Sequence, residues 1–247
     1  MLAALIAFTL ATISWSLWIR RFTWTCRLEV AATLNIALQG AALFLMSPYA
    51  SSTVGEWLYD VTGQRNLEDW LGHDCYVVAA SAIVYNAVGR LGAEAQERFK
   101  SEVEVPATLC IPLLFVTFTA GVGVEESHPD FFRVPTDMWL TLYWWLLCGT
   151  LAYLLAYGWQ ALIPLRREPE SRTVATVYMV SSSAGILACL IRIVTAALPG
   201  GVQDTFAASF LVWVLACGCG GGYAAMSACA WRDWVRAPIS AGEGRRG

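Results

Sequence analysis

The sequence has very little charge for its length. Only 14% of its 247 residues are Asp, Glu, Lys or Arg and 57% are hydrophobic, whereas soluble domains carry about 25% charged residues. The mean hydropathy is +0.53. Several runs without charge are about 20 residues long, which is the length needed to cross about 30 Å of hydrocarbon. The composition therefore predicts a multi-pass membrane protein and leaves no room for a soluble catalytic domain.

Several functional signatures are also missing. The only lysine, Lys100, is far from the last apolar run, which excludes a retinal Schiff base there. The sequence contains no P-loop, HExxH or GxSxG motif, no CaaX ending and no paired aspartates within apolar runs. The net charge of −3 gives no basic surplus for nucleic acid. We therefore expect a non-enzymatic protein with no cofactor and no nucleic-acid partner.

The eight cysteines do not form the pattern of a disulfide framework. Six of them lie in apolar runs, where a thiol behaves as a small hydrophobic group: Cys110, Cys148, Cys189, Cys217, Cys219 and Cys229. Cys26 and Cys75 do not share an aqueous loop with each other or with the rest. We expect neither a disulfide nor a metal cluster.

The apolar runs predict an all-α membrane protein, a bundle of seven transmembrane helices. The expected ranges are residues 1–19, 28–47, 70–90, 106–124, 137–159, 173–197 and 206–230, which make one membrane domain over 1–230, followed by a short basic tail over 231–247. The first run lacks a basic residue before it, so it is interpreted as a retained helix and not as a cleaved signal peptide. Asn66 is the expected N-cap of the third helix, with Glu68 and Asp69 in its first turn.

The basic residues predict the orientation. Thirteen fall in the first, third and fifth loops and the tail, and two, Arg65 and Arg133, fall in the other loops. The thirteen are Arg20, Arg21, Arg27, Arg90, Arg98, Lys100, Arg166, Arg167, Arg172, Arg232, Arg236, Arg245 and Arg246. Basic loops remain cytoplasmic, so we expect the N-terminus outside and the C-terminus inside the plasma membrane.

Two features are expected on the outer side. Val54, Trp57, Leu58 and Val61 share one helical face after Thr53, a candidate cap. This predicts a short interfacial helix, interpreted as a connector in preference to a lid. The outer loops are also acidic, through Glu56, Asp60, Glu68, Asp69, Asp74, Glu125, Glu126, Asp130, Asp137 and Asp204.

Polar side chains within apolar runs are the candidate ligand or pathway residues, because each needs a partner in a bilayer. They are Asn35, Gln39, Asp74, Ser81, Tyr85, Asn86, Tyr178, Ser181 and Arg192. Such residues, like the glycines of the CGCGGG segment at 217–222, either pack helices together or line a cavity or a hinge. His73 and His128 are the only histidines and lack HxxxH spacing, so a metal site is not favoured.

Arg192 is the only charged residue that the predicted ranges place well inside a helix. It lies about five residues before the outer end of the sixth predicted helix. We expect it to face the bundle interior and to form an ion pair with Asp74 or Asp137, because a carboxylate partner offsets the burial of the charge.

Two families resemble this chain. Its outline is similar to that of SWEET sugar transporters, although Pro112 is the only well-embedded proline and no repeat relates the first three helices to the last three. The stretch DVTGQRNLEDWLGH at 60–73 resembles the loop before the third helix in a seven-helix actinobacterial family labelled "putative transporter". Fifteen of 16 basic residues are arginine, as GC-rich genomes favour, which agrees with an actinobacterial or phage source. The resemblance to the actinobacterial family implies a seven-helix fold and no catalytic residues.

Two functions remain open. The first is a sensing or regulatory membrane protein that presents its basic inner loops to a cytoplasmic protein partner. The alternative is a small-solute transporter or channel with a polar pathway along the second, third and sixth predicted helices.

Overall fold

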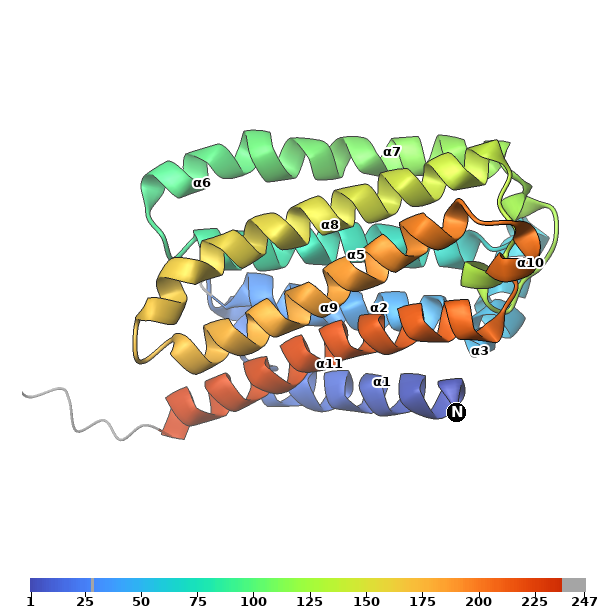
Figure 1. Cartoon of the computed structure of the whole chain (residues 1–247). Coiled ribbons are helices and arrows are strands. Elements are labelled where there is room, and N and C mark those ends of the chain that lie inside the picture. Colours follow the sequence, from blue (N-terminus) through green and yellow to red (C-terminus); the bar gives the residue numbers. More distant parts are fainter. Residues whose placement is uncertain (28, 237–247) are drawn as a thin grey trace, which may run out of the picture.

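The computed structural model describes residues 1–27 and 29–236, and the regular elements in this part of the chain are all helices, without a strand (Figure 1). The long helices are α1 (Leu2–Ile19), α2 (Val30–Leu45), α5 (Leu67–Val88), α7 (Val105–Ala120), α8 (Met138–Arg167), α9 (Arg172–Ala196) and α11 (Phe206–Arg236). The short ones are α3 (Pro48–Ala50), α4 (Glu56–Thr62), α6 (Ala93–Phe99) and α10 (Gly200–Gln203). Each of the seven predicted ranges falls on one of the long helices.

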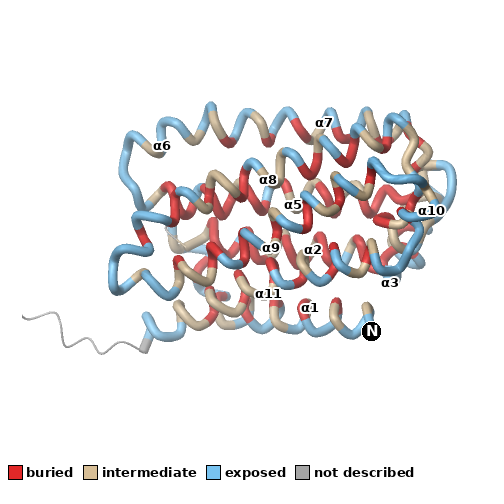
Figure 2. The backbone as a smooth tube through the Cα atoms, in the orientation of Figure 1, coloured by how far each residue is buried: buried red, intermediate tan, exposed pale blue. Residues whose placement is uncertain are grey.

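Six of the long helices form a closed ring. Going round it, α1 packs on α2, α2 on α5, α5 on α8, α8 on α9, α9 on α11 and α11 back on α1. Helix α7 lies outside this ring against α8 and α5. Figure 2 shows the buried segments on the inward sides of the ring helices, while most of α7 is exposed or half-buried. The ring therefore has an interior to which α7 does not contribute.

The chain runs up and down the bundle, so its loops gather at two ends (Figure 1). We call the end with the α1–α2, α5–α6 and α8–α9 connections the basic end, and the end with α3, α4 and α10 the acidic end. Eleven of the thirteen predicted inner basic residues are described and lie at or toward the basic end, whereas Arg245 and Arg246 lie outside the described residues. The basic residues that the sequence places on one side of the membrane therefore lie at one end of the bundle.

The helices are suited to a bilayer. Five are long and apolar enough to cross a membrane: Leu2–Ile19, Ala93–Ala120, Met138–Arg167, Arg172–Ala196 and Phe206–Val235. A sixth span is formed if Val30–Leu45 and Pro48–Thr62, bent by 60° at their junction, count together. Helix α5, with three acidic residues, is not among them. Exposed Phe8, Leu109 and Val180 provide apolar surface for lipid. These features indicate a multi-pass membrane protein.

Several helix ends differ from the sequence-based expectation. Helix α5 begins at Leu67 and α7 ends at Ala120, three and four residues before the predicted positions. The fourth predicted helix begins earlier, because α6 continues through the π-helical turn at Lys100–Glu104 into α7. Within α6, an ion pair between Arg98 and Glu94, four residues apart, stabilises the polar helical turn. Helices α8 and α11 also extend past the apolar runs, to Arg167 and Arg236. An apolar run shows only which part of a helix can lie in lipid. The same helix can continue into water with polar residues, which the apolar run does not predict.

The predicted cap Thr53 is wrong, whereas the predicted N-cap position Asn66, with Glu68 and Asp69 in the first turn, is confirmed without a side-chain cap bond. The Thr53 hydroxyl donates to the Tyr49 carbonyl within a helical turn, and the cap is instead Ser47, whose Oγ accepts from the Ala50 backbone N–H ahead of Pro48. Asn66 does precede α5, but it adopts a left-handed φ of 56° and its side chain makes no cap bond. That side chain bonds to a segment more than fifty residues away, as described below.

Candidate functional site

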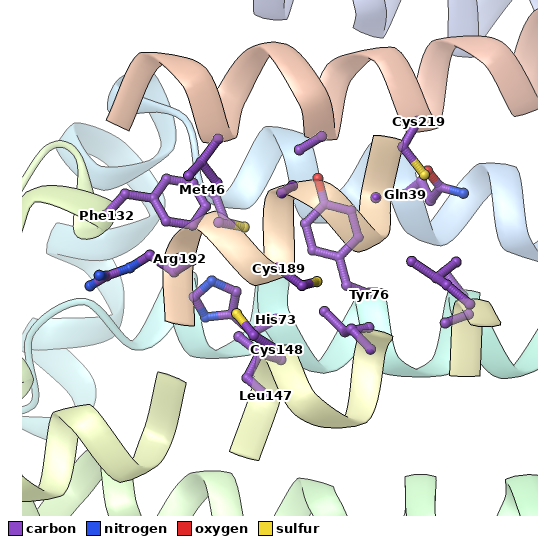
Figure 3. A pocket seen from close by; sticks show the side chains of 18 of the residues that line it. Gln39, Met46, His73, Tyr76, Phe132, Leu147, Cys148, Cys189, Arg192 and Cys219 are labelled. Carbon is purple, nitrogen blue, oxygen red and sulfur yellow. The ribbon is translucent and has the colours of Figure 1, made fainter. Parts of the chain in front are cut away.

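A cavity of about 90 Å³ lies inside the ring of helices. Its walls come from α2, α5, α8, α9 and α11, with Phe132 from the loop before α8. Figure 3 shows Arg192 at one end beside Phe132, His73 and Tyr76 in the middle, and Gln39 toward the other end. Most lining residues of α5, α8, α9 and α11 belong to the half of each helix nearer the acidic end, and Ala79, Ala80 and Leu155 lie just past the middle of theirs. The cavity therefore lies mainly in the acidic half of the bundle and reaches its middle.

Arg192 is buried at this cavity, with 1% of its surface exposed. Its guanidinium carbon lies 4.1 Å from the centre of the Trp144 ring, and one Nη donates to Thr195 Oγ1 at 3.2 Å. The Nε and the other Nη have no hydrogen-bond partner. A cation over an aromatic face gains about 1–2 kcal/mol when it is desolvated, which is less than the several kcal/mol that burying an ion takes. The charge of Arg192 is thus only partly compensated.

The predicted ion pair of Arg192 is wrong. Among the described residues no carboxylate lies within salt-bridge distance of its guanidinium. Asp137 instead caps α8, accepting the Leu140 backbone N–H at 2.8 Å. Asp74 does not line the cavity and has a buried oxygen without a partner. The expectation that Arg192 faces the interior is confirmed, and the face of Trp144 takes the place of a carboxylate.

His73 occupies the middle of the cavity within an aromatic surround. Its Nδ1 lies 2.6 Å from the Tyr143 hydroxyl, and its Nε2 has no partner. The ring lies edge-on to Trp144, with centroids 5.1 Å apart, and near Phe131 and Phe132. The bond to Tyr143 fixes the orientation of the imidazole. Its other ring nitrogen, Nε2, therefore has no hydrogen-bond partner.

The unpartnered polar atoms of the cavity lining share one property. Arg192 Nε and Nη, Trp144 Nε1 and Asn35 Nδ2 are all hydrogen-bond donors, and His73 Nε2 donates in one tautomer. Buried side chains with unpartnered acceptor oxygens, Glu68, Asp69 and Asp74, are absent from the lining. Among the lining residues, the buried polar atoms without a partner are therefore donors, and most of the other lining residues are Ala, Leu, Cys and aromatic side chains.

Residues 121–137, which we call the lid segment, close the acidic end of the cavity. Asn66 Nδ2 donates to the carbonyls of Gly123 and Glu126 at 2.6 and 2.8 Å, and Asn66 Oδ1 accepts the His128 backbone N–H at 3.0 Å. Asp130 accepts from Ser209 and from Trp213 Nε1 on α11. These bonds hold Phe131 and Phe132 over His73 and Trp144.

The basic half of the bundle is packed differently. Arg20, 2% exposed, donates to Thr33 Oγ1, to the carbonyls of Ser227 and Glu29, and to Glu29 Oε2 at 2.9 Å. A second layer joins α9 to α11, because the Tyr178 hydroxyl bonds to Ser227, and the Ser182 and Tyr223 hydroxyls lie 2.5 Å apart. These polar groups satisfy one another and seal the bundle below the cavity.

The glycines at 217–222 serve close packing at two positions. A Cβ on Gly222 would overlap Ser181 Oγ of α9, and one on Gly220 would lie 2.9 Å from Gln39 Oε1 of α2. A Cβ on Gly185 of α9 would lie 2.8 Å from Leu155 Cδ1. A side chain at these positions would displace its neighbours, so the glycines allow α11 to approach α2 and α9, and α9 to approach α8.

The structure divides the candidate residues into two groups. Asn35, Gln39, His73 and Arg192 line one cavity. The others do not: Asp74, Ser81, Tyr85, Asn86, Tyr178, Ser181 and His128. Tyr85 is exposed and packs on Phe99, and Tyr178 belongs to the bonded layer below the cavity.

Sequence reasoning missed Tyr143, Trp144 and Phe132. Tyr143 and Trp144 lie in an aromatic run, MWLTLYWW, that also fits an interfacial belt. Only their position one turn or more inside the helix, after Asp137, distinguishes them from anchors. Comparison with protein families, with curated proteins and with solved structures found no match.

Proposed function

We propose that the chain is a membrane receptor with seven spans that binds a small molecule in its interior cavity and signals through a separate protein at its basic end. The acidic end faces outside, in agreement with the distribution of basic residues. The observation that carries the proposal is the buried Arg192, with two unpartnered donor nitrogens, in the lining of the interior cavity. A natural protein retains such a defect where function requires it, since intramembrane charges mark functional sites.

The difference between the acidic and basic halves of the bundle supports a receptor over a transporter. The cavity lies mainly in the half that we place outside, and below it Arg20, Tyr178 and Tyr223 join α1, α2, α9 and α11 through hydrogen bonds. A solute crossing the protein would have to break this layer. A ligand arriving from outside needs only the lid segment to move.

The basic end offers a surface for a partner. Arg166, Arg167 and Arg172 surround a shallow groove at the turn between α8 and α9. All three are exposed. Helix α9 carries Arg192 near its other end, so a shift of this helix on ligand binding would move the groove as well. An acidic surface on a cytoplasmic protein fits such a groove.

A transporter is the second candidate, and one observation favours it. Asn35 and Gln39 continue the cavity lining along α2 toward the basic end, with Gln39 Nε2 donating to Asn35 Oδ1 at 2.8 Å. If the bonded layer opened, these amides would extend the polar route to the other side.

Thiol accessibility separates the two functions. Cys148 and Cys189 line the cavity, so the test uses a chain in which the other six cysteines are alanine, reconstituted in sealed vesicles of known orientation. A receptor predicts labelling by a membrane-impermeant methanethiosulfonate from the acidic-end side alone. Labelling from the basic-end side would favour a transporter, and labelling from neither side would contradict a ligand route. The same chain with Cys148→Ala and Cys189→Ala is the control.

The orientation has its own test. Cysteine placed at Ser127 should react in intact cells, and cysteine at Ser101 or Ser171 only after permeabilisation. A second outer position is Ser52, which is exposed, whereas the neighbouring Ser51 is buried. Reaction of Ser101→Cys in intact cells would overturn the proposed seven spans.

A further inference from the structure

We infer that the cavity binds a small carboxylate with a short apolar tail, whose carboxylate group is held by Arg192. This inference rests on the proposed receptor function and names its ligand class. The carboxylate would accept from the unpartnered Nε and Nη of Arg192, with His73 Nε2 and Trp144 Nε1 as further donors of the same lining.

The positive charge of Arg192 favours an anionic ligand. Arg192 is always protonated in a protein, and its described contacts are a neutral ring, a threonine hydroxyl and no carboxylate. An anion would supply the missing countercharge and two acceptors at once. Guanidinium and carboxylate are both planar, so they can pair through two parallel hydrogen bonds. A cation would be repelled, and a neutral apolar ligand would leave the donors unpaired.

The lining limits the rest of the ligand. Beyond the donors it is mostly apolar, through residues such as Leu147, Ala188 and Val212, with Gln39 and Tyr76 as polar exceptions, so the remainder of the ligand should be mainly apolar. The volume of about 90 Å³ compares with about 150 Å³ for an engineered apolar cavity that holds benzene. A ligand of about four heavy atoms, such as acetate, fits that scale, and propanoate and butanoate are the next longer carboxylates of the same kind.

The acidic surface around the cavity does not oppose this inference at equilibrium. The exposed acids Glu125 and Glu126 lie on the lid segment, and exposed charges are screened beyond about 8 Å at physiological ionic strength. Their repulsion slows the approach of an anion. The buried carboxylates Glu68 and Asp69 lie outside the cavity lining. Asp130 of the lid segment interacts electrostatically with Arg192 but is bonded to Ser209 and Trp213 and also lies outside the lining, so Arg192 is the only charged residue of the described lining.

Equilibrium dialysis of the purified full chain in detergent with [14C]propanoate tests the inference. The ionic strength is held constant with sodium sulfate. We expect saturable binding of one propanoate per chain, displaced by acetate and butanoate. Because the ligand is so small, the dissociation constant should be about micromolar or weaker. Arg192→Gln should weaken binding at least tenfold, since a charge-assisted pair is lost.

Controls separate binding from folding. Arg65→Gln removes an exposed arginine of the same end, paired with Glu56, and should change the affinity by less than twofold. Trp144→Phe keeps an aromatic face beside Arg192 while removing the Nε1 donor, and should weaken binding by a smaller factor than Arg192→Gln. Thermal unfolding shows whether each variant is folded, and if Arg192→Gln is not, Trp144→Phe decides: unchanged affinity in that variant would overturn the inference.

Three results would overturn the ligand class while leaving the receptor proposal to its own thiol-accessibility test. Equal binding of propan-1-ol would show a neutral ligand. Displacement of propanoate by chloride at equal concentration would show a site for any small anion. Absence of propanoate binding in the folded wild-type chain would reject the carboxylate outright.

Discussion

Arg20 and Arg192 are both almost fully buried, and the structure treats them in opposite ways. Arg20 makes four hydrogen bonds to Thr33, Ser227 and Glu29, including an ion pair. Arg192 makes one hydrogen bond and a contact with Trp144, and two of its nitrogens are unpartnered. The difference teaches that burial of a charge does not by itself reveal its role. Its hydrogen-bond partners decide whether a buried arginine holds helices together, as Arg20 does, or has donors free to bind a ligand, as we propose for Arg192.

The same contrast extends over both halves of the bundle. Apart from Asn35, the described residues with buried unpartnered side-chain atoms, which include Glu68, His73 and Arg192, lie in the acidic half. The basic half pairs its polar groups across α1, α2, α9 and α11. Since buried polar groups are normally satisfied, the acidic half is where this protein departs from a purely structural bundle.

The largest expected effect is that of Arg20→Met. The variant removes the four hydrogen bonds of the guanidinium, one of them an ion pair with Glu29, while Glu29 keeps its second ion pair with Arg90. At about 1 kcal/mol or somewhat less for each bond, we expect a loss of about 3 kcal/mol. For a chain of this size that corresponds to a fall of about 6–12 °C in the unfolding midpoint, measured by thermal unfolding in detergent. Arg21→Met, which removes an exposed neighbour, is the control. An unchanged midpoint for Arg20→Met would show that the basic half is not the structural one.

Asn66→Ala comes next and addresses the lid segment. It removes three hydrogen bonds to residues 123–128 and places alanine at a φ of 56°. We expect a loss of about 2 kcal/mol and faster hydrogen exchange at residues 121–137, followed by mass spectrometry. Asn66→Gly restores the backbone conformation without the side chain. If Asn66→Gly exchanges as slowly as wild type, the side-chain bonds do not hold the lid.

These residues also show what the sequence can predict. The apolar runs place the seven long helices, and the distribution of basic residues matches the two ends, because both are local properties of the chain. Asn66 was expected next to a helix start and is found there, yet its function depends on Gly123 and Glu126. Arg20 was interpreted as a loop charge, since nothing local indicates that Thr33 and Ser227 surround it. Partners distant in sequence could not be inferred.

A smaller effect is expected for Tyr223→Phe in the bonded layer. The variant removes a buried hydroxyl that lies 2.5 Å from Ser182 Oγ, while Ser182 keeps its bond to the Tyr178 carbonyl. The loss should be about 1 kcal/mol, the typical net value of a hydrogen bond. Tyr85→Phe, at an exposed hydroxyl, provides the comparison in the same thermal assay. A stability loss for Tyr85→Phe as large as that for Tyr223→Phe would argue against a special role for the layer.

Arg192→Met should have the smallest effect on stability, although it removes a side chain only 1% exposed. Methionine has a similar length and removes an incompletely paired charge, and replacing buried ions by apolar groups is often neutral or stabilising. The lost contact with Trp144 was worth about 1–2 kcal/mol, so the opposing terms nearly cancel. We expect an unfolding midpoint within about 3 °C of wild type, a change of about 1 kcal/mol or less. A fall as large as that of Arg20→Met would mean that Arg192 is a structural residue, and the distinction between the two arginines would then be lost.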